Sequence, residues 1–232
     1  MAKAIFITGT GTDVGKTYVT ALLVKKLAES GRNAAYYKAA MSGNARRADA
    51  SLIPGDALAV KTVSGIAQPL EAMCPYVYEN AVSPHLAARI EGNPVEMETV
   101  RQGFTALCKD YDFITMEGSG GILCPIRRDE TRLDLEDVIR ALRLPSLIVA
   151  DAGLGTINAV GLTAFYMREK GLPVKGILFN HWTGDTMQRD NLAMCEALTG
   201  LPVLACVADG DTALAMDADA LAALYDETEA GK

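Results

Sequence analysis

The sequence is poor in the side chains from which zinc sites and charge-relay triads are built. Only two histidines and five cysteines occur among 232 residues, and no two cysteines form a C-x-x-C pair. A zinc site is therefore not expected, and scattered thiols are typical of reduced, mostly buried cysteines in a cytoplasmic enzyme. We find no Ser-His-Asp, Cys-His or paired-carboxylate constellation that indicates another type of catalysis.

Long apolar runs and net positive charge are also missing. No apolar stretch approaches the roughly 20 residues of a membrane span. The chain runs from Met1 directly into an apolar segment, so a signal peptide is not expected. The formal net charge of −7 argues against nucleic acid as the main partner, because phosphate backbones select basic surfaces. Half of the residues are hydrophobic and 22% are charged, which is typical of a globular protein.

The first eighteen residues carry the clearest local signal. Residues 4–8 (AIFIT) form a short apolar run that predicts a buried strand, a glycine-rich turn follows at 9–15, and Lys16-Thr17 opens a helical pattern. Glycines let backbone amides converge on an anion, the helix N-terminus adds partial positive charge, and the lysine adds a full one. The stretch predicts a phosphate-binding loop for a nucleoside triphosphate, with Thr17 as a Mg²⁺ ligand.

The spacing of this loop is irregular. A strict G-x-x-x-x-G-K-[ST] pattern needs glycine at position 10, which is Thr10, and Gly9 gives one residue too many. The alternative is an ordinary strand-turn-helix junction with an incidental lysine. The surrounding strand and helix favour the phosphate loop.

Strands and helices alternate along the rest of the chain. This pattern predicts one α/β domain over 1–232, a parallel sheet with helices on both faces as in P-loop nucleotide hydrolases. The further expected strands span 33–39, 111–117, 146–150, 174–180 and 202–207, with a short extended piece at 75–78. The further expected helices span 56–65, 98–109, 133–144 and 156–170. Another helix begins at Ser83-Pro84 with serine as its cap, one lies between the strands 174–180 and 202–207, and an alanine-rich one begins at Thr212.

Polar side chains stand where expected strands end. In parallel sheets ligands bind at the carboxyl ends of the strands, which would place Lys38, Glu117 and Asn180 in one crevice. Glu117 ends an apolar strand before a glycine-rich turn, the position of an acid that holds Mg²⁺ opposite a phosphate loop. The alternatives are a surface lysine and a turn acid. Asp56 follows a polar loop and has the simpler explanation that acids favour helix starts.

A second helix N-terminus follows the expected strand 146–150. Residues 154–158 (LGTIN) open this helix, and backbone amides there suit an anion such as a substrate carboxylate. A plain connector explains the same residues equally well.

Several motifs in order resemble the dethiobiotin synthetases of biotin biosynthesis over residues 5–180. The matching stretches are TGTGTDVGKT (8–17), YKAAMSG (37–43), GDAL (55–58), PY (75–76), SPH (83–85), MEGSGG (116–121) and LGTIN (154–158). The extra residue in the phosphate loop is a feature of that family. The resemblance implies ATP- and Mg²⁺-dependent carboxylation of 7,8-diaminopelargonate with CO₂ or bicarbonate, in a cytoplasmic homodimer.

The resemblance also assigns roles to individual residues. It implies that Lys38 and Lys16 are catalytic, that Lys16 holds the β- and γ-phosphates, and that Asn180 contacts adenine. Substrate contacts would come from Thr12 and Ser42, and from Gly155, Thr156 and Asn158 of the neighbouring subunit. The nucleotide would meet Asp13, Val14, Gly15, Lys16, Thr17, Tyr18, Asp56, Glu117, Gly118, Ser119, Gly120 and Asn180, with Thr17, Asp56 and Glu117 as metal ligands.

The chain departs from the family pattern at three places. Ala39 replaces a common proline, Ala159 a common histidine, and residues 206–210 (CVADG) lack the usual glycine-x-isoleucine-proline, which leaves the nucleotide preference open. The main alternative is an ATPase switch of the ParA or MinD type. Such proteins carry a second lysine early in the phosphate loop, and this chain has Gly11 at that position. A cobyrinate-type amidase would need a glutaminase domain for which no chain remains.

Overall fold

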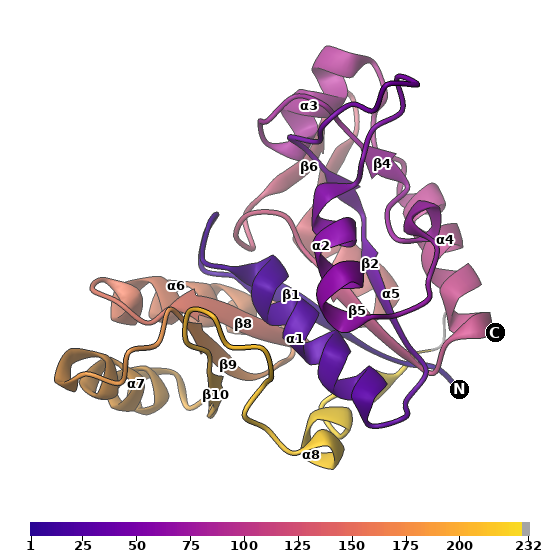
Figure 1. The fold of residues 1–232 in the computed structure, drawn as a ribbon. Coiled ribbons are helices and arrows are strands. Elements are labelled where there is room, and N and C mark those ends of the chain that lie inside the picture. Colours follow the sequence, from indigo (N-terminus) through magenta and orange to yellow (C-terminus); the bar gives the residue numbers. More distant parts are fainter. Residues whose placement is uncertain (229–232) are drawn as a thin grey trace.

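The computed structural model describes residues 1–228, and a seven-stranded sheet forms its centre (Figure 1). The strand order is β10-β9-β8-β1-β5-β2, and neighbours along this path are parallel. The remaining strand, β11, runs antiparallel beside the start of β1. The strands are β1 (Lys3–Gly9), β2 (Ala34–Lys38), β5 (Phe113–Glu117), β8 (Ser146–Asp151), β9 (Val174–Asn180), β10 (Val203–Cys206) and β11 (Asp226–Glu227).

The apolar run of β1 is buried on both faces of the sheet. Ile5, Phe6 and Ile7 are all 0% exposed. Because side chains alternate along a strand, Ile5 and Ile7 join one core cluster while Phe6 joins the cluster on the opposite face. A continuous apolar run is the pattern expected of a parallel strand that is covered twice.

Helices supply those two covers. Leu22 and Leu27 of α1 and Leu221 of α8 pack in the cluster that holds Ile5, whereas Phe104 of α4 and Val138 of α5 pack in the cluster that holds Phe6. Helix α6 covers that second face near β8, and α7 lies beside α6 at the β10 end of the sheet (Figure 1). The helices are α1 (Lys16–Glu29), α2 (Gly55–Ser64), α3 (Pro84–Glu91), α4 (Met97–Asp110), α5 (Leu135–Leu142), α6 (Thr156–Glu169), α7 (Thr186–Thr199), α8 (Ala218–Ala222) and the 3₁₀ turn η1 (Leu70–Ala72).

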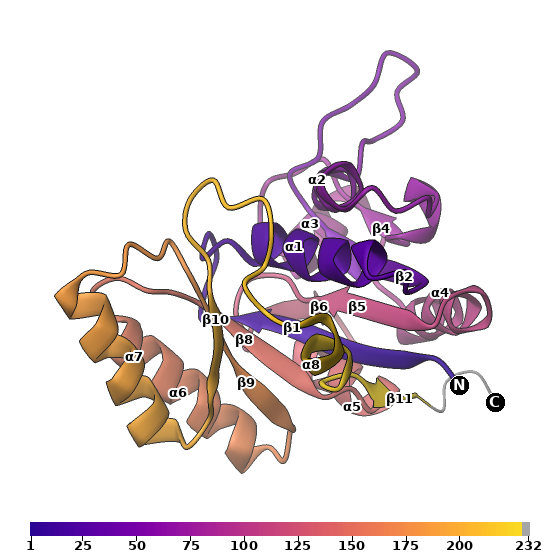
Figure 2. The same cartoon turned by 60° about the horizontal axis from the view of Figure 1, so that its bottom comes forward.

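Two small sheets lie outside the main one. Strand β3 (Ala40–Met41) pairs in parallel with β4 (Tyr76–Val77), and β6 (Pro125–Arg128) forms an antiparallel pair with β7 (Arg132–Asp134). The polar segment between β3 and α2 projects from the body of the molecule in Figure 2.

The predicted α/β class is confirmed: the sheet is mostly parallel and has helices on both faces. Three local expectations need correction. The last helix begins at Ala218 and not at Thr212, because the side chain of Asp217 accepts hydrogen bonds from the amides of Asp219 and Ala220. Strands β3, β6, β7 and β11 were not expected. Ser83 precedes α3 as predicted, but its hydroxyl contacts His85 Nδ1 (3.0 Å) instead of capping the helix.

The strand order places a crevice at the end of β1. From β1 the chain moves outward to β2, returns through β5, and then builds β8, β9 and β10 on the other side. Loops therefore diverge at the carboxyl end of β1, which is where open α/β sheets bind ligands.

Candidate functional site

The loop between β1 and α1 has the conformation of an anion cradle. Asp13 and Gly15 both have left-handed backbone angles, with φ of 60° and 80°. A Cβ on Gly15 would lie 1.9 Å from Nδ2 of Asn180, so only glycine fits there. Gly15 is also the N-cap of α1, which points the first amides of the helix into the loop. Lys16 Nζ donates to the carbonyl oxygen of Gly11 at 2.7 Å, across the loop.

Lys38 and Glu117 meet because their strands are neighbours. They end β2 and β5 and are register partners in the parallel ladder. Lys38 Nζ lies 2.7 Å from Glu117 Oε1 and 2.6 Å from Asp56 Oδ2 in the first turn of α2. Thr17 of α1 donates from Oγ1 to the same Glu117 oxygen at 2.8 Å. Four elements thus bring three oxygen-bearing side chains around one ammonium group.

Burial and charge set the ionisation of this cluster. Lys38 is 5% exposed, and burial alone would lower the pKa of its ammonium, but the carboxylates of Glu117 and Asp56 outweigh burial and raise that pKa. Burial would raise the pKa of the Asp56 carboxyl, yet Lys38 holds it below its usual range. Burial, followed by repulsion from Lys38, lowers the pKa of Lys16. Two cations of opposite pKa shift therefore flank one cleft.

This cleft has a volume of about 310 Å³ and contains most of the predicted residues. An apolar cavity of similar size, about 330 Å³, lies away from it between α6 and Pro173 and contains none of them. Only the first of these two cavities holds the charged cluster. The cleft is lined by Thr12, Asp13, Gly15, Lys16, Thr17, Tyr18, Lys38, Met41, Ser42, Asp56, Glu117, Ser119 and Gly120.

Three predicted nucleotide contacts lie beside the cleft and not on its wall. Val14 packs against the core, and its carbonyl oxygen accepts from Asn180 Nδ2 at 3.2 Å. Gly118 bonds through its amide to the carbonyl of Ile7, and a Cβ on Gly118 would lie 2.8 Å from the Phe6 ring. Asn180 is 1% exposed at the end of β9.

The start of α6 stands apart from the cleft within this chain. Gly155 (φ 93°) is the N-cap, Thr156 is buried and Asn158 is exposed. Gly155 and Asn158 line a separate apolar groove of about 480 Å³ over α6 and α7, which also includes Leu162 and Leu198. The structure does not bring Gly155, Thr156 and Asn158 together with Lys38 in one subunit.

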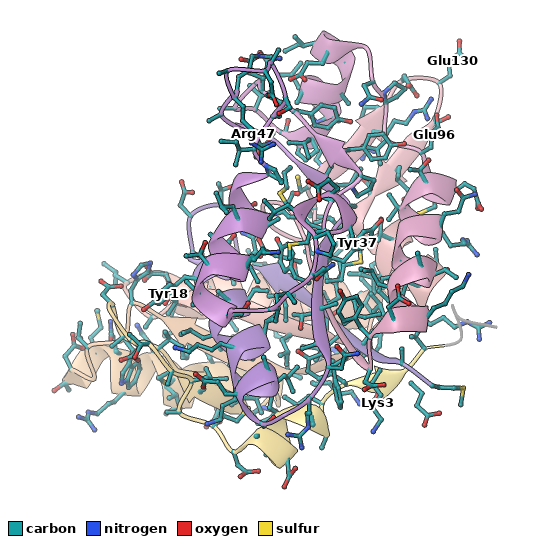
Figure 3. The ribbon with its side chains drawn as sticks, turned by 45° about the vertical axis from the view of Figure 1, so that its right-hand side comes forward. Lys3, Tyr18, Tyr37, Arg47, Glu96 and Glu130 are labelled. Carbon is teal, nitrogen blue, oxygen red and sulfur yellow. The ribbon has the colours of Figure 1, made fainter. Side chains whose placement is uncertain are left out.

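The contact between Tyr36 and Glu117 was not predicted from the sequence. The Tyr36 hydroxyl lies 3.2 Å from Glu117 Oε2, and burial together with Glu117 raises the pKa of Tyr36 well above its usual value. Residues two apart on a strand share a face, so the YYK stretch held a signal for Tyr36 beside Lys38. Tyr37 faces the other way, where its hydroxyl donates to Val100 O of α4 (Figure 3).

Hard oxygen donors make this cluster suitable for Mg²⁺. Thr17 Oγ1 and Lys38 Nζ both bond to Glu117 Oε1, and Lys38 Nζ also bonds to Asp56 Oδ2. A hydroxyl and two carboxylates are a donor set of the kind that Mg²⁺ uses beside phosphate oxygens and waters.

In residues 1–228 none of the helices combines the length and apolarity needed to cross a bilayer.

Comparison with known proteins finds relatives over most of the chain. Residues 3–212 match a family described as an AAA domain. The ATP-dependent dethiobiotin synthetase BioD of Brachyspira hyodysenteriae is 47% identical over 212 residues, which is 90% of this chain and 94% of that protein. The BioD of Clostridium botulinum strain 657 is 44% identical over 228 residues, 98% of this chain and all of that protein.

Solved structures with the same fold are more distant. A ParA family ATPase from Chlorobium tepidum has a TM-score of 0.56 at 14% identity, covering 96% of this chain and 88% of that one. MinD from Pyrococcus horikoshii, solved with Mg-ADP, has a TM-score of 0.53 at 17% identity, covering 90% and 82%. These two likenesses concern the fold, whereas the close relatives establish the family: the chain belongs to the dethiobiotin synthetases.

Proposed function

We propose that this protein is an ATP-dependent ligase that closes the ureido ring of dethiobiotin from 7,8-diaminopelargonate and CO₂. Membership of the family and the printed names of the relatives support the activity. The observation that carries the proposal is the Lys38 ammonium, held 2.6 and 2.7 Å from Asp56 and Glu117 beside the phosphate loop. A pure nucleotide-binding module has no use for this second buried cation.

The chemistry proceeds in three balanced steps. One amine of the substrate adds to CO₂ and loses a proton, which forms a carbamate. A carbamate oxygen attacks the γ-phosphorus of ATP, and ADP leaves. The second amine then attacks the carbamate carbon and loses a proton, the C–O bond breaks, and phosphate leaves as the ring closes. Phosphorylation converts a poor leaving oxygen into a good one, which is why ATP is required.

The two lysines act where negative charge accumulates. Carbamate and triphosphate repel each other, so cations held between them stabilise the transition state more than the separated anions. Lys16, in the loop, holds the β- and γ-phosphates, and Lys38 contacts the carbamate and the phosphoryl group in transit. In this structure the carboxylates of Glu117 and Asp56 outweigh burial and raise the pKa of Lys38, so the ammonium is present before substrate binds.

Mg²⁺ would be held by Thr17, Asp56 and Glu117 and would neutralise phosphate charge when bound. The Lys38 ammonium lies on two of these three side chains. Because Lys38 shares these carboxylates with the proposed metal site, its ammonium would be released toward the substrate if a divalent cation were held there.

The other lining residues fit supporting roles. Thr12 and Ser42 lie in the cleft with Lys38, where they can contact the diamine. Asn180 stands against the loop, where its amide can meet the adenine base. The remaining nucleotide contacts would come from Asp13, Val14, Gly15, Tyr18, Gly118, Ser119 and Gly120.

The apolar groove over α6 and α7 supports a homodimer. Leu154, Leu162 and Leu198 are exposed by 92%, 62% and 43%, more than a monomer surface usually leaves clustered. A second copy seated on this face would bring its own Gly155–Asn158 turn near a neighbouring cleft, where helix amides can bind the substrate carboxylate. We also expect a cytoplasmic location, since the substrates and reduced thiols belong there.

Measuring phosphate release with and without the diamine tests the function. We expect ATP hydrolysis only when 7,8-diaminopelargonate and bicarbonate are both present, with one dethiobiotin formed per phosphate. Hydrolysis that is independent of the diamine and stimulated by a protein partner would instead identify an ATPase switch of the ParA or MinD type.

A further inference from the structure

Asn180 has a buried amide that is satisfied on one side only. Nδ2 lies 3.2 Å from the carbonyl oxygen of Val14 and 3.2 Å from Nε2 of His181. Oδ1 is buried and has no hydrogen-bond partner within residues 1–228. Buried polar atoms are nearly always paired, so an unpaired oxygen beside a ligand loop indicates a donor on the ligand.

Two neighbours fix the orientation of this amide. The Val14 carbonyl can only accept, so the nitrogen of the amide must face it. His181 Nδ1 lies 2.6 Å from Asp209 Oδ1. A carboxylate oxygen accepts hydrogen bonds, so the N–H of the ring is at Nδ1. Because the amide nitrogen of Asn180 only donates, Nε2 is the acceptor in this contact. Both hydrogens of Nδ2 are thereby used, and Oδ1 is the only group left for a ligand.

The backbone holds the imidazole in this place. His181 has a left-handed backbone, with φ of 55°, which is uncommon for a residue other than glycine. The carbonyl of His181 accepts from Gln188, and the amide of Trp182 donates to Val207 O, so the turn is tied to α7 and to the segment after β10. Asp209 lies in that segment, within the stretch where this chain departs from its family.

We propose that His181 and Asp209 are positioning residues that make Asn180 an acceptor and so select the nucleotide base. Adenine and cytosine carry an exocyclic amine that can donate to Oδ1. Guanine and uracil carry a carbonyl oxygen at the equivalent place, which would face Oδ1 as a second acceptor. This inference rests on the proposed function, in which Asn180 meets the base, and it answers the question of nucleotide preference that residues 206–210 leave open.

Calorimetric titration with ADP, CDP, GDP and UDP tests the selection without requiring turnover. We expect the unaltered protein to bind ADP and CDP about tenfold more tightly than GDP and UDP, because a buried polar atom that meets a like partner loses its hydrogen bond. In His181→Phe and in Asp209→Ala the ratio of the affinity for ADP to the affinity for GDP should fall about fivefold, which corresponds to the loss of roughly one hydrogen bond. In turnover, the same change should appear in the KM for ATP more than in kcat.

Thr183→Ala serves as a matched control in the same turn. Its hydroxyl bonds to Asp185 and Gln188 and not to the amide of Asn180, so the base ratio should stay at its original value. Equal binding of all four diphosphates by the unaltered protein would overturn the inference. So would an unchanged ratio in both variants, or an equal loss of affinity for every nucleotide, which would indicate a structural role. Absence of dethiobiotin formation would instead overturn the proposed function and leave the binding ratios as they are.

Discussion

Lys38 carries its charge where water reaches almost none of its side chain. A buried ammonium is stable only when anions compensate it, and here two carboxylates lie within hydrogen-bond distance. Removing one member of such a cluster leaves the others as uncompensated charges. The residue proposed to carry the chemistry is therefore also a structural residue, and its replacement has two measurable effects.

We expect Lys38→Met to reduce turnover by about 100-fold or more, because one cation that stabilises the transferred phosphoryl group is lost. Stability should also fall, by about 3 kcal/mol, since Glu117 stays buried without its partner. Mg²⁺ should restore part of this loss by binding the freed carboxylates. Dethiobiotin formation and denaturant unfolding with and without Mg²⁺ measure the two effects. Lys109→Met, at an exposed lysine, is the control, and full turnover in Lys38→Met would contradict the assigned role.

The position of Lys38 could be predicted from sequence, but its contacts could not. A lysine at the end of an expected strand is placed at the ligand edge by a general property of parallel sheets. Its contact with Glu117 depends on β2 and β5 being neighbours in register, and residues 34–38 and 113–117 hold no local signal of that pairing. Asn180 illustrates the same limit, since its amide meets Val14 only after β9 joins the sheet.

Elements with strong apolar periodicity were predicted well, and those held by polar contacts were not. The strand at 174–180 agrees with β9, because its core side chains define it. The β6–β7 pair is rich in charge (PIRRDETRLD) and depends on ion pairs from Arg128 and Arg132 to Asp134. Such ion pairs form only after the chain has turned, so no hydrophobic pattern predicts these strands.

Asp134 links this pair of strands to α5 and predicts a pH effect. It precedes the helix, its amide donates to Asp137, and its carboxylate pairs with Arg128 and Arg132. Burial would raise its pKa, but these hydrogen bonds from the two arginines hold the pKa below the usual value of 3.8. A carboxyl whose pKa is lowered by folding stabilises the folded protein at pH values above its usual pKa. This contribution disappears as the pH falls through the lower pKa of the folded protein.

We expect Asp134→Asn to lower the free energy of unfolding by about 1 kcal/mol at about pH 7. Toward about pH 3 the difference should shrink, because the unaltered protein then loses the same charge. Urea unfolding across this pH range gives both values. Asp112→Asn, at an exposed aspartate, should show neither effect, and a difference that is constant with pH would rule out the ion pairs as its cause.

At the scale of the whole molecule, a charged cleft and an apolar groove lie in separate regions. Helices α6 and α7 lie at the β10 end of the sheet (Figure 1). The edge that ends β1, β2 and β5 carries the charged cleft, whereas the α6–α7 region carries exposed leucines. A turn proposed to bind substrate lies on the second region and away from the first. A single chain thus holds both parts of the proposed substrate site without joining them, which a second copy could do.

Leu162→Asp tests this arrangement. Leu162 is 62% exposed on α6, so the substitution should leave the monomer folded, but a charge in an apolar interface of two copies would have to be buried without a partner. We expect light scattering after gel filtration to give a dimer for the unaltered protein and a monomer for the variant. Turnover should fall by about tenfold or more, since the substrate carboxylate loses its helix terminus, while ADP affinity stays constant because the phosphate loop is complete in each chain.

Ile90→Asp is the matched control, because Ile90 is 56% exposed on α3, away from the groove, and should leave both mass and turnover unchanged. A monomeric unaltered protein with full turnover would show that each chain completes its own site, and Gly155, Thr156 and Asn158 would then be a connector.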